Sequence, residues 1–144
     1  MAGQVEIEAR AYGPESTPEE IAAIRSRLNL VDGKVLLWRE MPVMSAFTVD
    51  LCFDRAEELC RTHGCRVMIV DASTGTKPDA AGRRRIFERV SQLGGRLVHV
   101  ALVIDANPLV RAAARFVQAG LPIGLSIHNT FEAAMEEVHR VDRR

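Results

Sequence analysis

Apolar and polar residues follow one another along the chain in patterns that predict strands and helices in turn. Two nearly continuous apolar runs, residues 66–72 and 97–104, are typical of strands covered on both faces. A shorter apolar segment over residues 34–39 contains the only tryptophan and predicts a third strand, and residues 123–127 predict a short fourth one.

The first part of the chain carries two further patterns. Apolar and polar side chains alternate over residues 5–11 with the period of a half-buried strand. Residues 17–20 (Thr-Pro-Glu-Glu) predict a helix start, because threonine caps it, proline suits its first position and the second glutamate closes a capping box. The turn signal of Asp32 and Gly33 supports a competing interpretation, in which residues 24–39 form a hairpin. We prefer the helix.

Apolar residues at helical spacing predict helices between the later strands and at the C-terminus. One helix covers residues 47–63, and another begins near Asp79. Asn107, followed by proline, begins a third with an asparagine cap. Asn129 and Glu132 form a capping box that begins the last helix.

Strands that alternate with helices at this spacing imply crossover connections, so we predict a single α/β domain with a mainly parallel sheet. The opening strands would add an antiparallel edge and make the sheet mixed. Six side chains are expected to be buried in its core: Ile69, Val70, Phe87, Val103, Phe116 and Val138.

The composition excludes several classes of protein. With 144 residues, 47% apolar and 26% charged, the chain has the make-up of one globular domain. Nineteen basic and nineteen acidic residues cancel, so no overall field recruits nucleic acid or an anionic membrane. No run approaches the roughly 18 apolar residues of a membrane span, and the N-terminus lacks a signal-peptide pattern. We expect a cytoplasmic protein.

The cysteines and histidines form no metal or cofactor pattern. Cys52, Cys60 and Cys65 are an odd number without C-x-x-C spacing, which fits a reducing compartment. No histidine has a second ligand at metal-binding spacing. Dinucleotide loops, phosphate loops and nucleophile elbows are also absent from the sequence. We expect no catalytic residue and no bound zinc, flavin or nicotinamide.

Polar residues follow three of the predicted strands at the place where a ligand or partner would bind. In an α/β sheet the binding crevice lies beyond the carboxyl ends of the strands. Asp71, Ser73 and Thr74 arrive there after one strand, Asn107 after the next and His128 after the last. Alternatively they are turn and cap residues, which the same residue types favour.

Arg83, Arg84, Arg85 and Arg89 cluster early in one predicted helix. Cations near a helix N-terminus oppose the helix dipole by about 0.3 kcal/mol or more each, and a docked acidic partner or anion would offset this. The alternative is a solvated face screened by Glu88 and nearby acids. Nucleic acid is a poor explanation, because the chain has no overall positive charge.

From Lys34 to Val138 the order of elements resembles the STAS fold of anti-sigma-factor antagonists, the SpoIIAA-like group. The resemblance rests on a strand ending in Val70-Asp71-Ala72-Ser73, a loop, and a helix opened by Asp79-Ala80-Ala81-Gly82. A strand and helix (ALVIDANPLVRAAARFV) and a last short strand and helix (SIHNTFEAAMEEV) follow. The resemblance implies a STAS-like core over residues 34–144 after an extension of strand and helix over residues 1–33.

In that family the corresponding helix start carries a serine or threonine after the aspartate, and its hydroxyl is the phosphorylation switch that controls docking to a kinase-like partner. Here Asp79 and Gly82 match, but Ala80 has no hydroxyl, so this switch is not carried over. We expect constitutive docking, with Arg84 and Arg85 contacting the partner. A phosphate displaced to the preceding loop, on residue 73, 74 or 76, is the competing possibility.

Two functions compete at this stage. The resemblance implies a non-enzymatic bacterial regulatory or protein-interaction module, whose docking surface is the helix from Asp79 and the loop before it. The alternative is a domain that binds or acts on a small ligand in the crevice near Asp71, Asn107 and His128. Missing catalytic motifs favour the first. We also expect a homodimer, because the opening strand needs an edge to pair with.

Overall fold

The computed structural model of the protein describes residues 6–72, 80–93, 96–104 and 123–143. These residues form, in order, α1 (Pro18–Arg25), β1 (Leu28–Val31), β2 (Val35–Arg39), α2 (Ala46–His63), β3 (Val67–Asp71), α3 (Ala80–Leu93), β4 (His99–Val103), β5 (Gly124–His128) and α5 (Phe131–Asp142). The strands make one sheet in the order β1-β2-β3-β4-β5, in which only the β1–β2 pair is antiparallel. The predicted α/β fold with a mixed, mainly parallel sheet is therefore confirmed.

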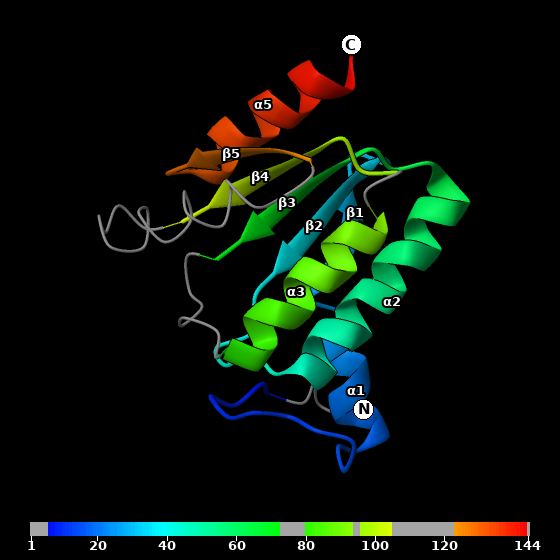
Figure 1. The fold of residues 1–144 in the computed structure, drawn as a ribbon, viewed down its shortest axis with the longest axis vertical. Coiled ribbons are helices and arrows are strands. Elements are labelled where there is room, and N and C mark those ends of the chain that lie inside the picture. Colours follow the sequence, from blue (N-terminus) through cyan, green and yellow to red (C-terminus); the bar gives the residue numbers. More distant parts are fainter. Residues whose placement is uncertain (1–5, 73–79, 94–95, 105–122, 144) are drawn as a thin grey trace.

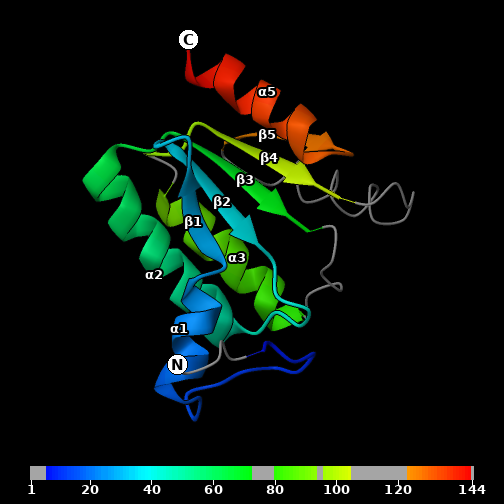
Figure 2. The same ribbon diagram turned by 180° about the vertical axis from the view of Figure 1, so that it is seen from behind.

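The sheet separates two hydrophobic cores. Helices α2 and α3 lie against one face and α5 against the other, as Figure 1 and the reverse view in Figure 2 show. Successive strand residues point to opposite faces, so Met68 and Val70 pack into the core under α2 and α3. Val67 and Ile69 pack on the other side with Ala134 of α5. These strand residues belong to β3, and because both faces of β3 are covered, its sequence is almost uniformly apolar.

Trp38 of β2 joins α2 to the sheet. It is 1% exposed and makes an edge-to-face contact with Phe53 of α2, with ring centroids 5.2 Å apart and ring planes at 79°. Aromatic pairs in this geometry stabilise a core by about 0.5–1.5 kcal/mol beyond the area they bury.

The predicted start of the first helix is confirmed. The Thr17 side chain accepts a hydrogen bond from the backbone N–H of Glu20, and the Glu20 carboxylate accepts one from the N–H of Thr17, which completes the capping box. The helix ends at Arg25, so our preference for helix over hairpin holds only up to that residue.

Residues 28–39 form the hairpin. Leu28 pairs with Trp38 and Val31 with Val35, and the loop between them contains Asp32 and Gly33 at φ values of 51° and 77°. These left-handed conformations suit Asp and Gly at a hairpin turn. The antiparallel edge of the sheet is therefore supplied by residues 28–31.

The strand predicted at residues 5–11 is wrong over the part that is described, because residues 6–16 contain no strand. Tyr12 is 2% exposed. Its hydroxyl accepts a hydrogen bond from the N–H of Glu8, and its carbonyl accepts one from Ser45 Oγ. The buried ring and these bonds tie the segment to the start of α2 without any pairing to the sheet.

The last helix begins one residue later than predicted. Thr130 is the N-cap, since its side chain accepts a hydrogen bond from the N–H of Ala133. The third helical position is then Ala133, which has no side-chain acceptor, so the capping box predicted for Asn129 and Glu132 is wrong. Helix α2, in contrast, ends at His63 as predicted, and its C-cap Gly64 has a φ of 67°.

Four of the six predicted core residues, Ile69, Val70, Val103 and Val138, are at most 8% exposed. Phe87 is only half-buried, because Val90 and Leu93 are the residues that α3 turns into the core. Phe116, with the helix predicted from Asn107, lies outside the described residues. Across the described part of the chain, no helix is long and apolar enough to cross a membrane.

Candidate functional site

The carboxyl ends of the parallel strands bring two of the predicted site residues into one row. Arg39, Asp71, Val103 and His128 are register partners across β2, β3, β4 and β5. Partners in register project from the same face, and Val103 packs into the core beneath α5. Asp71 and His128 are separated by one strand, so their Cα atoms lie roughly 10 Å apart. Ser73, Thr74, Asp79 and Asn107 lie outside the described residues.

Glu40 adds a second carboxyl group to this edge. Its backbone N–H donates to the carbonyl oxygen of Asp71 at 3.0 Å. Burial, together with the negative charge of Asp71, raises the pKa of the Glu40 carboxyl to about 7. A carboxyl group with this pKa exchanges a proton near neutral pH. The sequence gives no sign of this, because the effect depends on burial and on the neighbouring strand.

A chain of hydrogen bonds joins two histidines through a serine on the α5 face of the sheet. Ser126 Oγ lies 2.8 Å from Nε2 of His99 and 2.7 Å from Nε2 of His128. A hydroxyl carries one proton, so at most one of the two Nε2 atoms accepts from the serine and at least one donates to it. The chain thus links the buried His99 on β4 to His128 at the carboxyl edge.

Two charged residues of α5, Glu137 and Arg140, change the pKa of His99 in this row of hydrogen bonds. Burial lowers the pKa of His99, Glu137 raises it, and His128 and Arg140 lower it further. Hydrogen bonds from Arg140 lower the pKa of the Glu137 carboxyl. His99 therefore favours its neutral form in the folded protein.

The arginines of α3 take different roles. Arg89 is 4% exposed and donates to Asp50 at 2.8 Å, to Asp54 at 2.7 Å and to Glu57 at 3.2 Å, all on α2. Arg85 donates to Asp50 at 2.6 Å and to Glu88 at 2.7 Å. These two residues hold α3 on α2.

Arg84, in contrast, is exposed on α3, two residues beyond the buried Gly82. Of the two arginines predicted to contact a partner, Arg85 is thus committed to ion pairs within the molecule. Arg84 has no carboxylate partner among the described residues.

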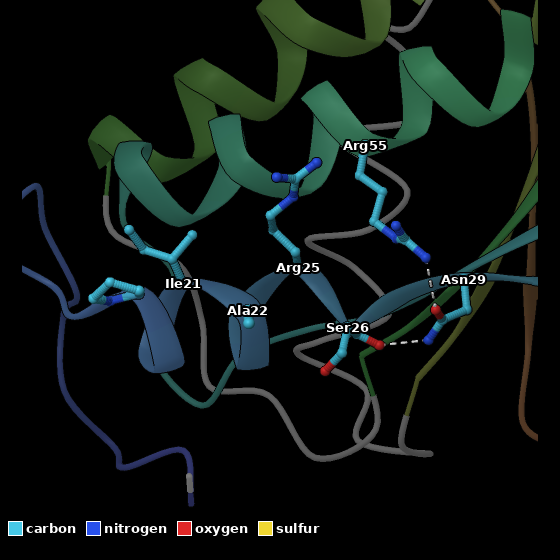
Figure 3. Close-up of a pocket in the computed structure, with 7 residues that line it drawn as sticks. Ile21, Ala22, Arg25, Ser26, Asn29 and Arg55 are labelled. Carbon is cyan, nitrogen blue, oxygen red and sulfur yellow. Dashed lines mark hydrogen bonds between the residues drawn. The ribbon is translucent and has the colours of Figure 1, made fainter. Parts of the chain in front are cut away.

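A groove lies on the opposite flank of α2, between α1 and β1 (Figure 3). It has a volume of about 540 Å³ and is lined by Pro18, Ile21, Ala22, Arg25, Ser26, Asn29 and Arg55. Arg55 reaches from α2 across the edge of the sheet, where its Nε donates to the carbonyl of Leu28 at 2.7 Å. Its lining residues come from three separate elements, so sequence spacing does not predict this groove.

The described residues contain no group of three or more side chains suited to a metal ion. The cysteines are free and buried. Burial raises the pKa of Cys52 to about 12 and that of Cys60 to about 11, so their thiolates are disfavoured.

Comparisons with known proteins identify the fold. No protein-family model and no curated protein matches the chain. An uncharacterized protein of the DUF3478 family from Shewanella loihica PV-4, with a SpoIIAA-like fold, superposes with a TM-score of 0.62 at 12% identity, over 76% of this chain and 88% of that one. The NMR structure of the protein TM1081 superposes with a TM-score of 0.59 at 17% identity, over 96% of this chain and 99% of that one.

The chain therefore has a SpoIIAA-like fold, as its resemblance to the STAS group implies. At these levels of identity the comparison establishes the architecture, and the function rests on the site itself.

Proposed function

We propose that the protein is a non-enzymatic, cytoplasmic bacterial regulatory module of the STAS-like class, which docks a protein partner through the exposed face of α3. The observation that carries this proposal is that the arginines of α3 differ in their contacts. Arg85 and Arg89 hold the helix on α2, while Arg84 is exposed to solvent. A helix fixed in this way presents a cation on a rigid surface, which suits an acidic patch on a partner.

Docking at this surface is proposed to be constitutive. In the resemblance to the STAS group, the switch hydroxyl would fall at Ala80, whose side chain cannot be phosphorylated. The arginine face requires no modification to attract carboxylates. Mass spectrometry of protein from its native host tests this point: stoichiometric phosphate on Ser73, Thr74 or Thr76 that alters partner capture would contradict it.

Replacement of Arg84 by glutamate tests the docking surface. Captured partner, measured by quantitative proteomics after crosslinking in the native host, should fall about tenfold or more, as expected when a cation at an acidic interface is reversed. Arg61→Glu, at an exposed position near the end of α2, is the matched control and should leave capture unchanged. Equal capture by the Arg84→Glu and wild-type proteins would refute the proposal.

Arg85 should be left intact in this experiment. Its guanidinium is bonded to Asp50 and Glu88, so Arg85→Glu would place like charges together and disturb the packing of α3. Circular dichroism of the Arg84→Glu protein should match that of the wild type.

The carboxyl edge favours a second candidate function, the binding of a small ligand. Glu40, with a pKa of about 7 beside Asp71, could exchange a proton with a bound molecule. Fragment screening by NMR tests this candidate: a genuine ligand should shift the amide signals of Glu40, Asp71 and His128, and Glu40→Gln should weaken its binding. Elemental analysis and an absorbance spectrum of the purified protein test the expectation that it carries no cofactor.

A further inference from the structure

The groove between α1, β1 and α2 is lined by apolar and by cationic side chains. Pro18, Ile21 and Ala22 of α1 supply the apolar ones. Arg25 rises from the last turn of the same helix, and Arg55 reaches toward it from α2 (Figure 3). None of the seven lining residues is acidic. A ligand that fits this groove must therefore carry both aliphatic or aromatic surface and negative charge.

Arg55 is held in place by neutral groups. Its Nε donates to the carbonyl of Leu28 at 2.7 Å and its Nη2 donates to Asn29 Oδ1 at 3.3 Å. A guanidinium has five N–H donors, so these two bonds orient the group and leave donors for another acceptor. Among the described residues no carboxylate pairs with Arg55, and its charge is not neutralised.

The neighbouring arginines extend this positive region. Arg27 donates to the backbone carbonyl of Glu40 at 3.4 Å and has no carboxylate partner among the described residues. Arg25 pairs with Glu58 at 3.6 Å, but the two side chains are 43% and 59% exposed, so the pair is weak. The charges of Arg25, Arg27 and Arg55 all act on the nearby Cys52 thiol. Of the two arginines that line the groove, only Arg25 has a carboxylate partner among the described residues, and that pair is weak.

We infer that this groove binds an acidic segment of a partner protein that also carries apolar side chains. Carboxylates of the segment would accept hydrogen bonds from the free donors of Arg55 and Arg25, and an aliphatic or aromatic side chain would cover Ile21 and Pro18. A free phosphate or small carboxylate would use the charges only, and would leave the apolar side chains exposed. This surface is separate from the exposed face of α3, so its test is independent of the Arg84 experiment.

Selection of random peptides displayed on phage against the full-length protein tests the inference without a known partner. The enriched peptides should combine two or more Asp or Glu residues with a large apolar residue. A synthetic peptide of the enriched sequence should shift the backbone amide signals of Ile21, Ala22 and Asn29 in an NMR titration. Raising the salt concentration should weaken its binding, because the contacts are ionic. Enriched peptides without an acidic bias, or shifts confined to another surface, would overturn the inference.

Substitutions at Ala22 give the sharpest test, because this residue is exposed and lies in α1, where charged side chains are well tolerated. Ala22→Glu should lower the affinity for the selected peptide about tenfold, because the new carboxylate repels it. Ala22→Lys introduces a side chain of similar size and opposite charge, and this variant should bind the peptide at least as well as the wild type does. Equal binding by the two variants would refute the inference.

Arg55→Gln should also lower the affinity for the peptide. Circular dichroism checks that the hairpin stays folded without the Arg55 side chain. Sodium phosphate and sodium acetate serve as competitors at constant ionic strength. If either displaces the peptide completely at low concentration, the groove is a site for simple anions and the inference of a peptide partner is wrong.

Discussion

A Cβ atom at position 124 would lie 2.8 Å from Nδ1 of His99, closer than side chains approach one another in folded proteins. Gly124 and His99 are register partners on β5 and β4, so the glycine makes room for the imidazole that begins the His99–Ser126–His128 chain. The small residue on the edge strand is thus a condition for the hydrogen bonds beside it.

Gly124→Ala should therefore destabilise the protein by about 1–3 kcal/mol, since the ring must move and its bond to Ser126 is strained or lost. Urea unfolding measures the effect. The same substitution made in a His99→Ala background is the control, and should cost much less because no ring opposes the new methyl group. Equal costs in both backgrounds would show that the crowding has no consequence.

The stability of the protein should depend on pH through two groups with opposite signs. Glu40 has a folded pKa of about 7 against an ordinary value of 4.5, so the folded state binds more protons between these pH values. Its contribution is present below pH 4.5 and is lost as the pH rises toward 7. Glu40→Gln should remove this loss, measured by urea unfolding across the pH range, while Glu19→Gln on the exposed start of α1 should not.

His99 acts in the other direction. Its folded pKa lies below the ordinary value of 6.5, so the unfolded chain binds more protons once the pH falls below that value. The contribution of His99 is complete above about pH 6.5 and is lost on acidification. His99→Gln should flatten the acid side of the stability profile. An unchanged acid slope in this variant would show that His99 is protonated as easily in the folded protein as in the unfolded one.

Arg89 should contribute more to stability than any exposed arginine of α3. Arg89→Ala leaves Asp50, Asp54 and Glu57 without their shared cation, and should cost about 2–3 kcal/mol. The loss is below that of a fully enclosed pair because Asp54 is 64% exposed. Arg84→Ala is the matched control, for which thermal unfolding should show a change of only a few tenths of a kcal/mol.

The two candidate caps of α5 can be told apart by mutation. Thr130→Ala removes the acceptor for the N–H of Ala133 and should cost about 1 kcal/mol. Asn129→Ala should cost much less, because the Asn129 side chain is exposed and precedes the cap. Larger destabilisation by Asn129→Ala would restore the cap that the sequence predicts.

The sequence was sufficient for the features that depend on local pattern. The continuous apolar runs identify β3 and β4, and residues 17–20 identify the start of α1. Local pattern misled at residues 5–11, because Ala9 and Ala11 are exposed and only Ile7 of the described part packs against the core. The expected homodimer loses its argument from an unpaired opening strand, since the described residues 6–16 form no strand that needs an edge. Dimerisation stays a prediction, to be tested by light scattering.

The candidate sites depend on contacts that sequence spacing does not contain. His99 and Ser126 are 27 residues apart, and the Arg89 cluster joins α3 to carboxylates 32–39 residues earlier. Both arise only when crossover connections bring distant segments side by side. That Asp71 and His128 lie at the same edge of the sheet can be predicted from the sequence, because parallel strands end at one edge and both residues end a strand.

Trp38 gives the protein a built-in optical reporter. It is the only tryptophan in the chain, and it lies against Phe53 where α2 meets the sheet. Its emission maximum and intensity therefore come from a single environment, and separation of α2 from the sheet should shift the emission to longer wavelength as water reaches the indole. Comparison of this signal with far-ultraviolet circular dichroism would show whether the helix leaves the sheet in the same step in which the chain loses its secondary structure.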